Sequence, residues 1–288
     1  MRHQSSFFCA MMKIFSFGAF QLEYQEYGTG EEVIFCFHGF GRPTTDFEIF
    51  LPLLRKYQRM VSIALFAHAH SVFPAERIVR QPLQPKEWKE ILGAFCLKLG
   101  IHSFHLLGYS IGARVVFITM LQMPQQVKSV LLLAPDGLKI NPLYRFASST
   151  RLGHSLYLAV IRNPSWLFRT AGVLNKMGLL SDKLLRFVHV HLDTLEKRQQ
   201  VHDAWMIYRK FFPDPQELAS LINKEFFSFH MIFGKYDEVI KPKLGIKLQR
   251  KLQKKNQLLV VDMGHRLLQH KVLESISKEK WWPNGINT

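Results

Sequence analysis

One stretch of sequence decides the fold: Phe104-His105-Leu106-Leu107-Gly108-Tyr109-Ser110-Ile111-Gly112. Its first residues are apolar enough for a short buried strand, and an apolar run from Ile111 to Met123 predicts a helix directly after it. The G-x-S-x-G pentapeptide lies at the junction, which is the strand–turn–helix setting of a nucleophile elbow. Such a turn is strained and crowded, so small residues are needed on both sides of the serine. We therefore predict that Ser110 is a nucleophile at the N-terminal end of a helix, where developing negative charge is favoured.

The segments around this stretch alternate between apolar strands and helices. Continuous apolar runs indicate strands buried on both faces, as in a parallel sheet, at Val33–Phe37, Met60–Leu65, Phe104–Leu107 and Val127–Ala134. Pro85 opens a helix with regular apolar spacing that stops at Gly100. Residues 12–27 alternate aromatic and polar side chains, which predicts an antiparallel hairpin at a sheet edge.

The strand rhythm stops over residues 139–222, where helical stretches rich in aromatic residues and Arg take over. Strands return at Phe226–Phe233 and Leu258–Val261, with a helix at about Pro242–Lys254 between them. We therefore expect an α/β fold with a mostly parallel central sheet flanked by helices. Residues 12–138 and 223–280 would form the core, and residues 139–222 an inserted helical cap, or lid.

A serine hydroxyl is a weak nucleophile and needs a general base, which in turn needs an orienting acid. His265 comes just after the last predicted strand, and Asp237 follows the strand before it in Phe233-Gly234-Lys235-Tyr236-Asp237. We predict a catalytic triad of Ser110, Asp237 and His265. Asp136, after the strand Val127–Ala134, is the alternative acid, and we favour Asp237 because of its Gly-x-x-Asp setting.

The motif His38-Gly39-Phe40-Gly41 follows the first buried strand. Acyl-transfer chemistry generates an oxyanion, which two preorganised backbone N–H groups should stabilise. The amides of Phe40 and Ile111 are the natural pair for this oxyanion hole. We expect His38 itself to be a structural histidine of the turn.

Together these motifs resemble those of the α/β-hydrolase superfamily, in its order, over about residues 20–138 and 225–275: His38-Gly39-Phe40-Gly41, Gly108-Tyr109-Ser110-Ile111-Gly112, Gly234-Lys235-Tyr236-Asp237 and Gly264-His265. The resemblance implies Ser110 as nucleophile, Asp237 as acid, His265 as base, and oxyanion amides on Phe40 and Ile111. The chain departs from the family at Leu65–Ser71, where members often carry an acidic, glycine-rich loop. Ser110 argues against the haloalkane dehalogenases and epoxide hydrolases, which resemble this fold but use an aspartate nucleophile.

The elbow and Arg114 after it resemble the same stretch of the menaquinone-pathway succinyl-cyclohexadiene-carboxylate synthase. In that family the matching arginine binds a substrate carboxylate, so Arg114 and its neighbour Tyr109 are candidate substrate-binding residues. Arg114 lies one helical turn after Ser110 on the same face. Pairing of Arg114 with a nearby acid or carbonyl is an equally good interpretation.

The predicted function is a serine hydrolase that cleaves a small or medium acyl (carboxylic) ester through an acyl-enzyme, with no cofactor and no metal. The alternative is a lyase or C–C bond hydrolase that uses the same triad on a carboxylated substrate. A fold retained only for binding is the least favoured interpretation, because it would not need all of these motifs. Aromatic residues of the cap could line an acyl pocket, form the cap's own core, or do both: Trp166, Phe168, Trp205, Tyr208, Phe211 and Phe212.

The formal net charge is +16, and residues 241–288 carry eleven Lys or Arg against three acidic residues. Such a surface could attract anionic substrates, membranes or nucleic acid. We favour a solvated basic face, with a small-molecule acyl substrate as partner, no nucleic acid, and peripheral membrane contact as the less favoured alternative. Leu244, Leu248 and Leu252 form one stripe of the basic helix at Pro242–Lys254, which predicts packing on the sheet.

Histidine and cysteine usage does not indicate a metal site. His68/His70 and His189/His191 have H-x-H spacing, but no cluster of carboxylates or cysteines accompanies them, so we expect ordinary surface or cap histidines. The three cysteines, Cys9, Cys36 and Cys96, are odd in number and unpatterned, which favours a reducing compartment. Lys13 interrupts the apolar start, and no run of about 18 uncharged apolar residues exists. We therefore predict a cytoplasmic protein.

Overall fold

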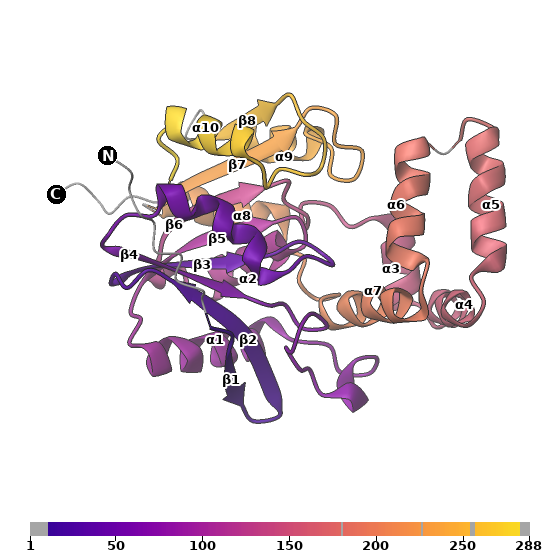
Figure 1. Cartoon of the computed structure of the whole chain (residues 1–288), viewed down its shortest axis with the longest axis horizontal. Coiled ribbons are helices and arrows are strands. Elements are labelled where there is room, and N and C mark those ends of the chain that lie inside the picture. The colour runs from indigo at the N-terminus through magenta and orange to yellow at the C-terminus, as the bar shows by residue number, and fades with distance from the viewer. Residues whose placement is uncertain (1–10, 180, 226, 254–256, 283–288) are drawn as a thin grey trace.

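The computed structural model describes residues 11–179, 181–225, 227–253 and 257–282 (Figure 1). Cys9 lies outside the described residues. The described part is built on an eight-stranded sheet with the strand order β1-β2-β4-β3-β5-β6-β7-β8. In chain order the strands are β1 (Lys13–Phe17), β2 (Phe20–Tyr27), β3 (Glu32–Phe37), β4 (Gln58–Ile63), β5 (Phe104–Tyr109), β6 (Val127–Leu133), β7 (Ser228–Gly234) and β8 (Leu258–Val261).

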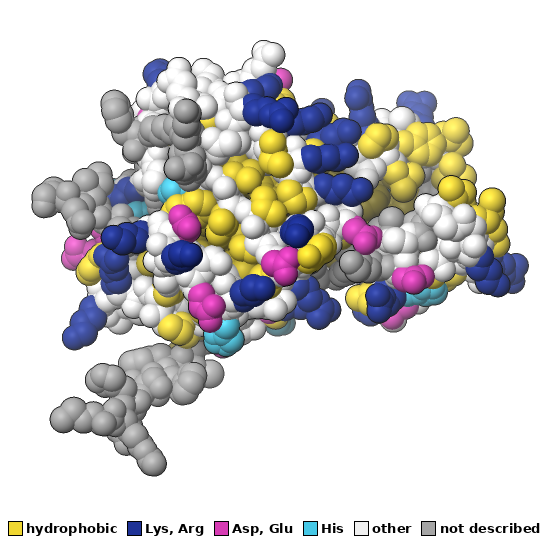
Figure 2. Space-filling model, turned by 90° about the horizontal axis from the view of Figure 1, so that it is seen from above, with side chains coloured by type: hydrophobic (Ala, Val, Ile, Leu, Met, Phe, Trp, Pro, Cys, Tyr) yellow, Lys and Arg dark blue, Asp and Glu magenta, His cyan; other side chains and the backbone are white. Residues whose placement is uncertain are grey.

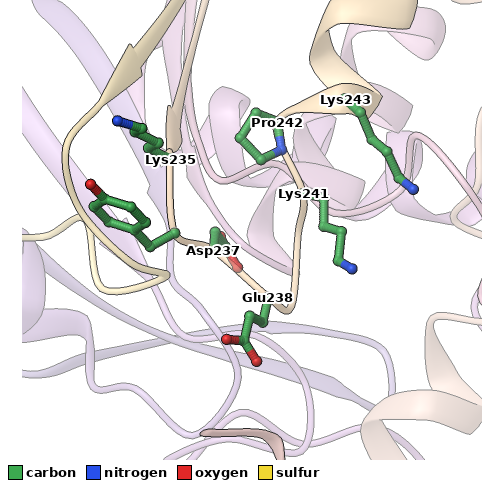
Figure 3. Close-up of a pocket in the computed structure, with 7 residues that line it drawn as sticks. Lys235, Asp237, Glu238, Lys241, Pro242 and Lys243 are labelled. Carbon is green, nitrogen blue, oxygen red and sulfur yellow. The ribbon is translucent and has the colours of Figure 1, made fainter. Parts of the chain in front are cut away.

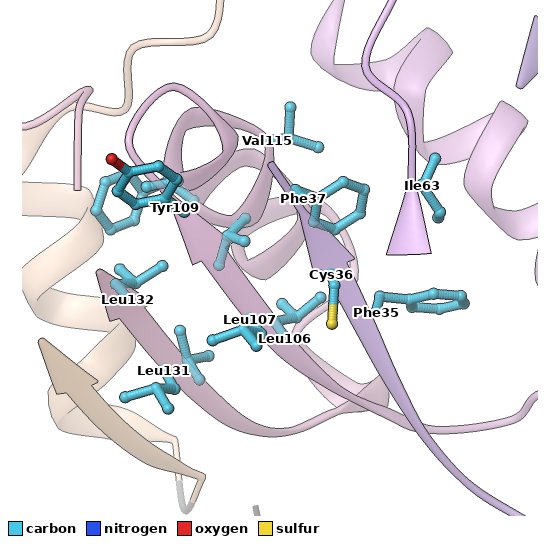
Figure 4. Close-up of a cluster of buried hydrophobic side chains, with 14 of the residues drawn as sticks. Phe35, Cys36, Phe37, Ile63, Leu106, Leu107, Tyr109, Val115, Leu131 and Leu132 are labelled. Carbon is cyan, nitrogen blue, oxygen red and sulfur yellow. The ribbon is translucent and has the colours of Figure 1, made fainter. Parts of the chain in front are cut away.

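The sheet is mostly parallel, as the apolar runs predicted. Strands β3 to β8 pair in parallel, whereas β1 and β2 form an antiparallel hairpin and β2 pairs antiparallel to β4. The hairpin expected at residues 12–27 therefore lies at one edge of the sheet. Buried side chains of β3, β5 and β6 fill the centre of the molecule (Figure 4).

Helices cover both faces of this sheet. Helices α1 (Pro85–Leu99) and α2 (Gly112–Gln122) pack against each other on one face, while the 3-10 helix η1 (Thr44–Leu53) and α10 (His270–Lys278) pack together on the other (Figure 1). Two short 3-10 helices, η2 (Ala75–Arg77) and η3 (Pro124–Gln126), lie in the connections. Helix α2 is buried on nearly every side, as its apolar sequence predicted.

Helix α9 (Lys243–Gln249) is shorter than the predicted helix at Pro242–Lys254. Lys254 lies outside the described residues. Two members of the predicted leucine stripe, Leu248 and Leu252, are buried against the main core, and Leu244 is partly buried there. The prediction that this helix packs on the sheet is confirmed, and its lysines remain exposed.

Among the described residues, six helices lie in the predicted helical block, the last of which runs two residues past its end: α3 (Pro142–Ser149), α4 (Arg151–Arg162), α5 (Ser165–Lys176), α6 (Asp182–Leu192), α7 (Leu195–Ile207) and α8 (Pro215–Lys224). Helices α3 to α7, which we call the helical layer, stand beside the sheet, and α5 and α6 form an upright hairpin (Figure 1). Helix α8 instead packs on α2, with Leu218 and Ile222 in the main core.

The helical layer has its own small apolar cluster of Ala147, Tyr157, Ile161 and Val201. The side chain of Phe40 packs against this cluster and against the main core, so it lies where the two parts meet. Among the described residues, no helix is both long enough and apolar enough to cross a membrane.

Candidate active site

Ser110 lies in a strained and crowded turn between β5 and α2. Its φ is 52°, in the left-handed region that residues other than glycine seldom adopt. A Cβ at position 112 would lie 2.0 Å from the carbonyl oxygen of Phe37, and one at position 108 would lie 2.8 Å from the Val116 side chain. The two glycines of the pentapeptide are therefore needed for the close approach of the turn to its neighbours, as the sequence pattern indicated.

The structure brings Ser110, His265 and Asp237 into one hydrogen-bonded chain. Ser110 Oγ lies 3.1 Å from His265 Nε2, and His265 Nδ1 lies 2.7 Å from Asp237 Oδ2. His265 follows β8 and Asp237 follows β7, so all three residues come from the carboxyl ends of parallel strands. With the serine donating to Nε2, the imidazole carries its proton on Nδ1 and donates it to the carboxylate.

The Asp237 carboxylate is buried and is held by its own loop. Its Oδ1 accepts hydrogen bonds from the backbone N–H groups of Val239 and Ile240, both at 2.8 Å. These two donors hold Oδ1 in place and leave Oδ2 directed at His265. The fixed carboxylate in turn orients the imidazole.

Asp136, the alternative acid, has different partners. Its carboxylate accepts hydrogen bonds from Arg114 and from the backbone N–H of Gly137. Its own N–H donates to the carbonyl oxygen of Ser110. The structure therefore places Asp237 against His265, and Asp136 beneath the elbow.

Arg114 is almost completely buried, with 5% of its surface exposed. Its Nε donates to Asp136 Oδ2 at 2.8 Å, and its Nη2 lies 2.5 Å from the same oxygen. The guanidinium also lies 4.7 Å from the ring centre of Tyr144 and 4.1 Å from that of Phe212. The pairing with a nearby acid is thus present, while buried Nη1 has no hydrogen-bond partner in the described part of the chain.

The hydroxyl of Tyr109 is used within the protein. It donates to the backbone carbonyl of His265 at 3.0 Å, and its ring lies 5.6 Å from the imidazole. Burial raises the pKa of Tyr109 to about 12, so the phenol stays protonated and remains a donor. This contact braces the loop that carries His265.

The loop after β3 lies against the elbow. A Cβ at position 39 would lie 2.8 Å from the Tyr109 ring and 3.5 Å from Ser110 Cβ. This brings the backbone of the Gly39–Gly41 segment, which contains Phe40, close to the nucleophile. Ile111 directly precedes α2, and the first N–H groups of a helix have no acceptor within it.

His38 is a buried structural histidine. Its Nδ1 donates to the carbonyl oxygen of Gly39 at 2.7 Å, and its Nε2 accepts from the N–H of Leu65 at 3.0 Å. Burial lowers its pKa to about 3, which keeps the ring neutral and able to do both. It ties the loop after β3 to the loop after β4, the role expected for it.

His68 is the residue near this site that sequence reasoning missed. We expected an ordinary surface or cap histidine, and this is wrong: the side chain is buried, and burial lowers its pKa to about 4. Its Nε2 accepts a hydrogen bond from the N–H of Gly41 at 3.0 Å, while Nδ1 donates to the carbonyl oxygen of Phe66 at 3.2 Å. Its ring lies 5.2 Å from that of Phe40.

The backbone around His68 is strained. Ala67 and Ala69 have φ values of 64° and 47°, conformations that cost roughly 1 kcal/mol or more each for a residue with a Cβ. Helix α7 holds this turn, because Gln200 Nε2 donates to the carbonyl oxygen of Ala67 at 3.0 Å. Alanine at both positions concealed the turn, since glycine is the usual sequence signal for positive φ.

The other histidines of the H-x-H pairs lie apart from the site. His70 is largely exposed, and its Nδ1 lies 2.6 Å from Glu23 Oε2. His189 stacks on Phe168 at 4.6 Å, and the side chain of His191 is outside the described set. Within the described residues, no group of three potential ligands could hold a metal ion.

The predicted aromatic residues of the helical block do not form one cluster. Tyr208 and Phe211 are buried in the main core, and the Tyr208 hydroxyl accepts from the N–H of Phe66. Trp205 stacks on Tyr157, whereas Trp166 is exposed. Phe212 lies close to the helix that follows the elbow, through its contact with Arg114.

A surface depression of about 320 Å³ lies on the outer side of the loop after β7 (Figure 3). Its walls come from seven residues: Lys235, Tyr236, Asp237, Glu238, Lys241, Pro242 and Lys243. Three lysines and two carboxylates line this depression, so its basic groups are in slight excess. It lies at the loop that carries Asp237, the residue that bonds to His265.

Comparison with known proteins agrees with this architecture. A family model described as alpha/beta hydrolase fold matches residues 32–269. The chain is similar to a solved hydrolase from Pseudomonas aeruginosa PA01 (14% identity, 94% of this chain and 98% of that chain, TM-score 0.66). It is also similar to a thermophilic esterase from Thermogutta terrifontis (16%, 94% and 98%, 0.64) and a serine hydrolase from Cycloclasticus zankles (16%, 95% and 99%, 0.62). The search of curated proteins found no match.

Proposed function

Because this chain belongs to the alpha/beta hydrolase fold family and is an enzyme of the hydrolase type, we propose that it cleaves a small or medium acyl ester through an acyl-enzyme. The observation that carries the proposal is the unbroken hydrogen-bonded chain from Ser110 through His265 to Asp237. A nucleophile, a base and an orienting acid in this order are what acyl transfer to a serine requires.

In the proposed mechanism, Ser110 Oγ attacks the ester carbonyl while His265 Nε2 takes its proton. Asp237 stabilises the imidazolium that forms and keeps the ring in the productive orientation. The tetrahedral intermediate then collapses: the imidazolium gives its proton to the alcohol as the alcohol departs. The acyl group remains bound to Ser110 Oγ. Water, activated by the same imidazole, releases the acid and restores the serine.

The oxyanion of each tetrahedral intermediate would be stabilised by the backbone N–H groups of Phe40 and Ile111. The close approach of the Gly39 backbone to Ser110 and the position of Ile111 beside α2 support this assignment. Two such donors in a water-poor site are worth several kcal/mol in the transition state. Within the predicted cap of residues 139–222, the proposal assigns the helical layer, α3 to α7, to limiting the size of the acyl group, while α8 packs on the core.

A second candidate keeps the triad but changes the reaction to a lyase or C–C bond hydrolase acting on a carboxylated substrate. The observation that favours it is the buried Nη1 of Arg114, which has no partner among the described residues. Against it, Asp136 already neutralises this guanidinium. If Arg114→Gln lowers turnover of a succinyl or diketo acid far more than turnover of a neutral ester, the second candidate is correct.

Two substitutions test the proposed function. Ser110→Ala should abolish turnover of p-nitrophenyl esters and labelling by a fluorophosphonate, with an unchanged circular dichroism spectrum. Asp237→Asn should lower kcat by about 10⁴, because the imidazole loses its orienting charge. Asp136→Asn is the matched control and should retain far more activity in the folded fraction. Ester turnover that survives Ser110→Ala would overturn the proposal.

A further inference from the structure

One face of the molecule combines exposed apolar and basic side chains (Figure 2). Seen from above, hydrophobic side chains gather on the helical layer, and Lys and Arg side chains gather beside them on the neighbouring edge of the core. The apolar part includes the end of α5 and the turn after it, which we call the hairpin tip: Val173, Leu174, Met177 and Leu179. Met177 and Leu179 are 65% and 69% exposed.

The hairpin tip contains a hydrogen-bonded turn. Helix α5 ends in a Schellman motif, in which Gly178 has a φ of 72° and its N–H donates to the carbonyl oxygen of Asn175. The N–H of Leu179 donates to the carbonyl oxygen of Leu174, both bonds being 2.9 Å long. The backbone therefore holds these apolar side chains outward, and α5 buries only Ala171 among its described residues.

The segment from α3 to α6, which includes the hairpin tip, carries an excess of positive charge. Residues 142–192 contain seven Lys or Arg and a single acidic residue, Asp182. Arg169 and Lys176 on α5 and Arg186 on α6 are exposed. Exposed apolar patches often mark surfaces that contact a protein, a ligand or a membrane, and an excess of positive charge attracts anionic partners.

A hydrogen bond connects the hairpin tip to the basic edge of the core. Ser181, at the end of the turn, donates its hydroxyl to the carboxylate of Glu238 in the loop after β7. That loop and α9 expose four lysines, of which the first three line the depression in Figure 3: Lys235, Lys241, Lys243 and Lys247. Tyr236 and Ile246 are exposed between them.

We propose that this face binds the surface of a bilayer that contains anionic phospholipids. The side chains of the hairpin tip would enter the boundary between headgroups and acyl chains, while the lysines of the loop and α9 contact lipid phosphates. A second copy of the chain fits less well, because a symmetric contact would oppose like charges across the interface. The inference goes beyond the proposed function, and binding to lipid does not depend on it.

Co-sedimentation of the full chain with vesicles tests the proposal. The protein should bind phosphatidylcholine vesicles weakly and bind them much more tightly when phosphatidylserine is included. Met177→Asp combined with Leu179→Asp should lower the partition coefficient at least about tenfold on both vesicles, because the apolar insertion is lost. A triple variant, Lys241→Gln with Lys243→Gln and Lys247→Gln, should lower the partition coefficient by about fivefold for each charge removed. This loss should occur on anionic vesicles only.

Matched controls lie on other parts of the surface. Leu97→Asp changes a leucine that is 84% exposed on α1, and a second variant combines Lys86→Gln, Lys89→Gln and Lys128→Gln. Both should bind vesicles as the unchanged protein does, and circular dichroism should show every variant folded. The proposal is overturned if the unchanged protein does not co-sediment with anionic vesicles. It is also overturned if the control variants lose as much binding as the test variants. A concentration-dependent dimer that the hairpin-tip variant abolishes would also overturn it, in favour of a second copy as occupant.

Discussion

His68 contacts the backbone that lies beside the nucleophile. Its neutral ring accepts from the amide of Gly41, the residue after Phe40, whose own amide is proposed to hold the oxyanion. A lone pair at this position is needed, because the Gly41 N–H, which lies in a partly buried contact, would otherwise lose its acceptor within the protein. His68 is therefore a positioning residue in the proposed mechanism.

We predict that His68→Ala lowers kcat for neutral esters by about tenfold or more and changes KM little, since an oxyanion hole acts mainly on the transition state. His68→Gln, whose side-chain oxygen can accept from Gly41, should recover part of the loss. His70→Ala, two residues away and exposed, is the control and should leave kcat unchanged. Equal effects on kcat and KM, or no difference between the Ala and Gln variants, would argue for a merely structural role.

At the scale of elements, the junction of β5 and α2 is set by how closely backbone segments approach. Position 112 touches the end of β3, where a side chain would meet a carbonyl oxygen and not a flexible group. In contrast, a Cβ at Gly93 in α1 would meet no atom within 4 Å. A side chain is therefore excluded at Gly112 but has room at Gly93, although both glycines lie in helices.

Gly112→Ala should lower the free energy of unfolding by about 2 kcal/mol or more, because the elbow or β3 must shift to make room. Gly93→Ala should raise it by up to about 1 kcal/mol, since alanine restricts the unfolded chain and favours helix. Urea unfolding followed by circular dichroism measures both. If Gly112→Ala leaves the free energy of unfolding unchanged, the close approach of position 112 to Phe37 does not limit side-chain size there.

At the scale of the whole molecule, burial keeps several imidazoles neutral. It lowers the pKa to about 3 for His38 and to about 4 for His68, His105 and His230. Between these values and the ordinary value near 6.5, the unfolded chain binds protons that the native chain does not. Stability is therefore highest above about pH 6.5 and falls as the pH decreases towards about 4.

We expect each of these histidines to contribute up to about 1.4 kcal/mol per pH unit to this loss. Urea unfolding at a series of pH values gives the slope directly. His230→Phe should reduce the slope of the unfolding free energy against pH by the contribution of one histidine. Phenylalanine has no titrating group, and it can keep the stacking on Trp281, which the imidazole makes at 4.4 Å. A stability that stays constant between about pH 6.5 and about pH 5 would contradict the burial of these rings.

The sequence by itself determined the parallel sheet, the edge hairpin, the elbow and the helical block, because each depends on a pattern that repeats within a few residues. Continuous apolar runs separate buried strands from helices, and glycine beside serine marks the strained turn. The helix predicted at Pro242–Lys254 ends earlier in the structure, at Gln249. The sequence did not indicate this end, because the leucine spacing and the lysines continue beyond it.

Only the tertiary structure decided which distant side chains meet. Asp237 and Asp136 both follow strand ends, and the choice between them depends on where the His265 loop crosses the sheet edge. The contact of His68 with Gly41 spans 27 residues, and the link from Ser181 to Glu238 spans 57. Such contacts are set by the order and register of strands and by the packing of helices. Local sequence patterns carry no record of them, because periodicity reports which face of an element is buried and not what lies against it.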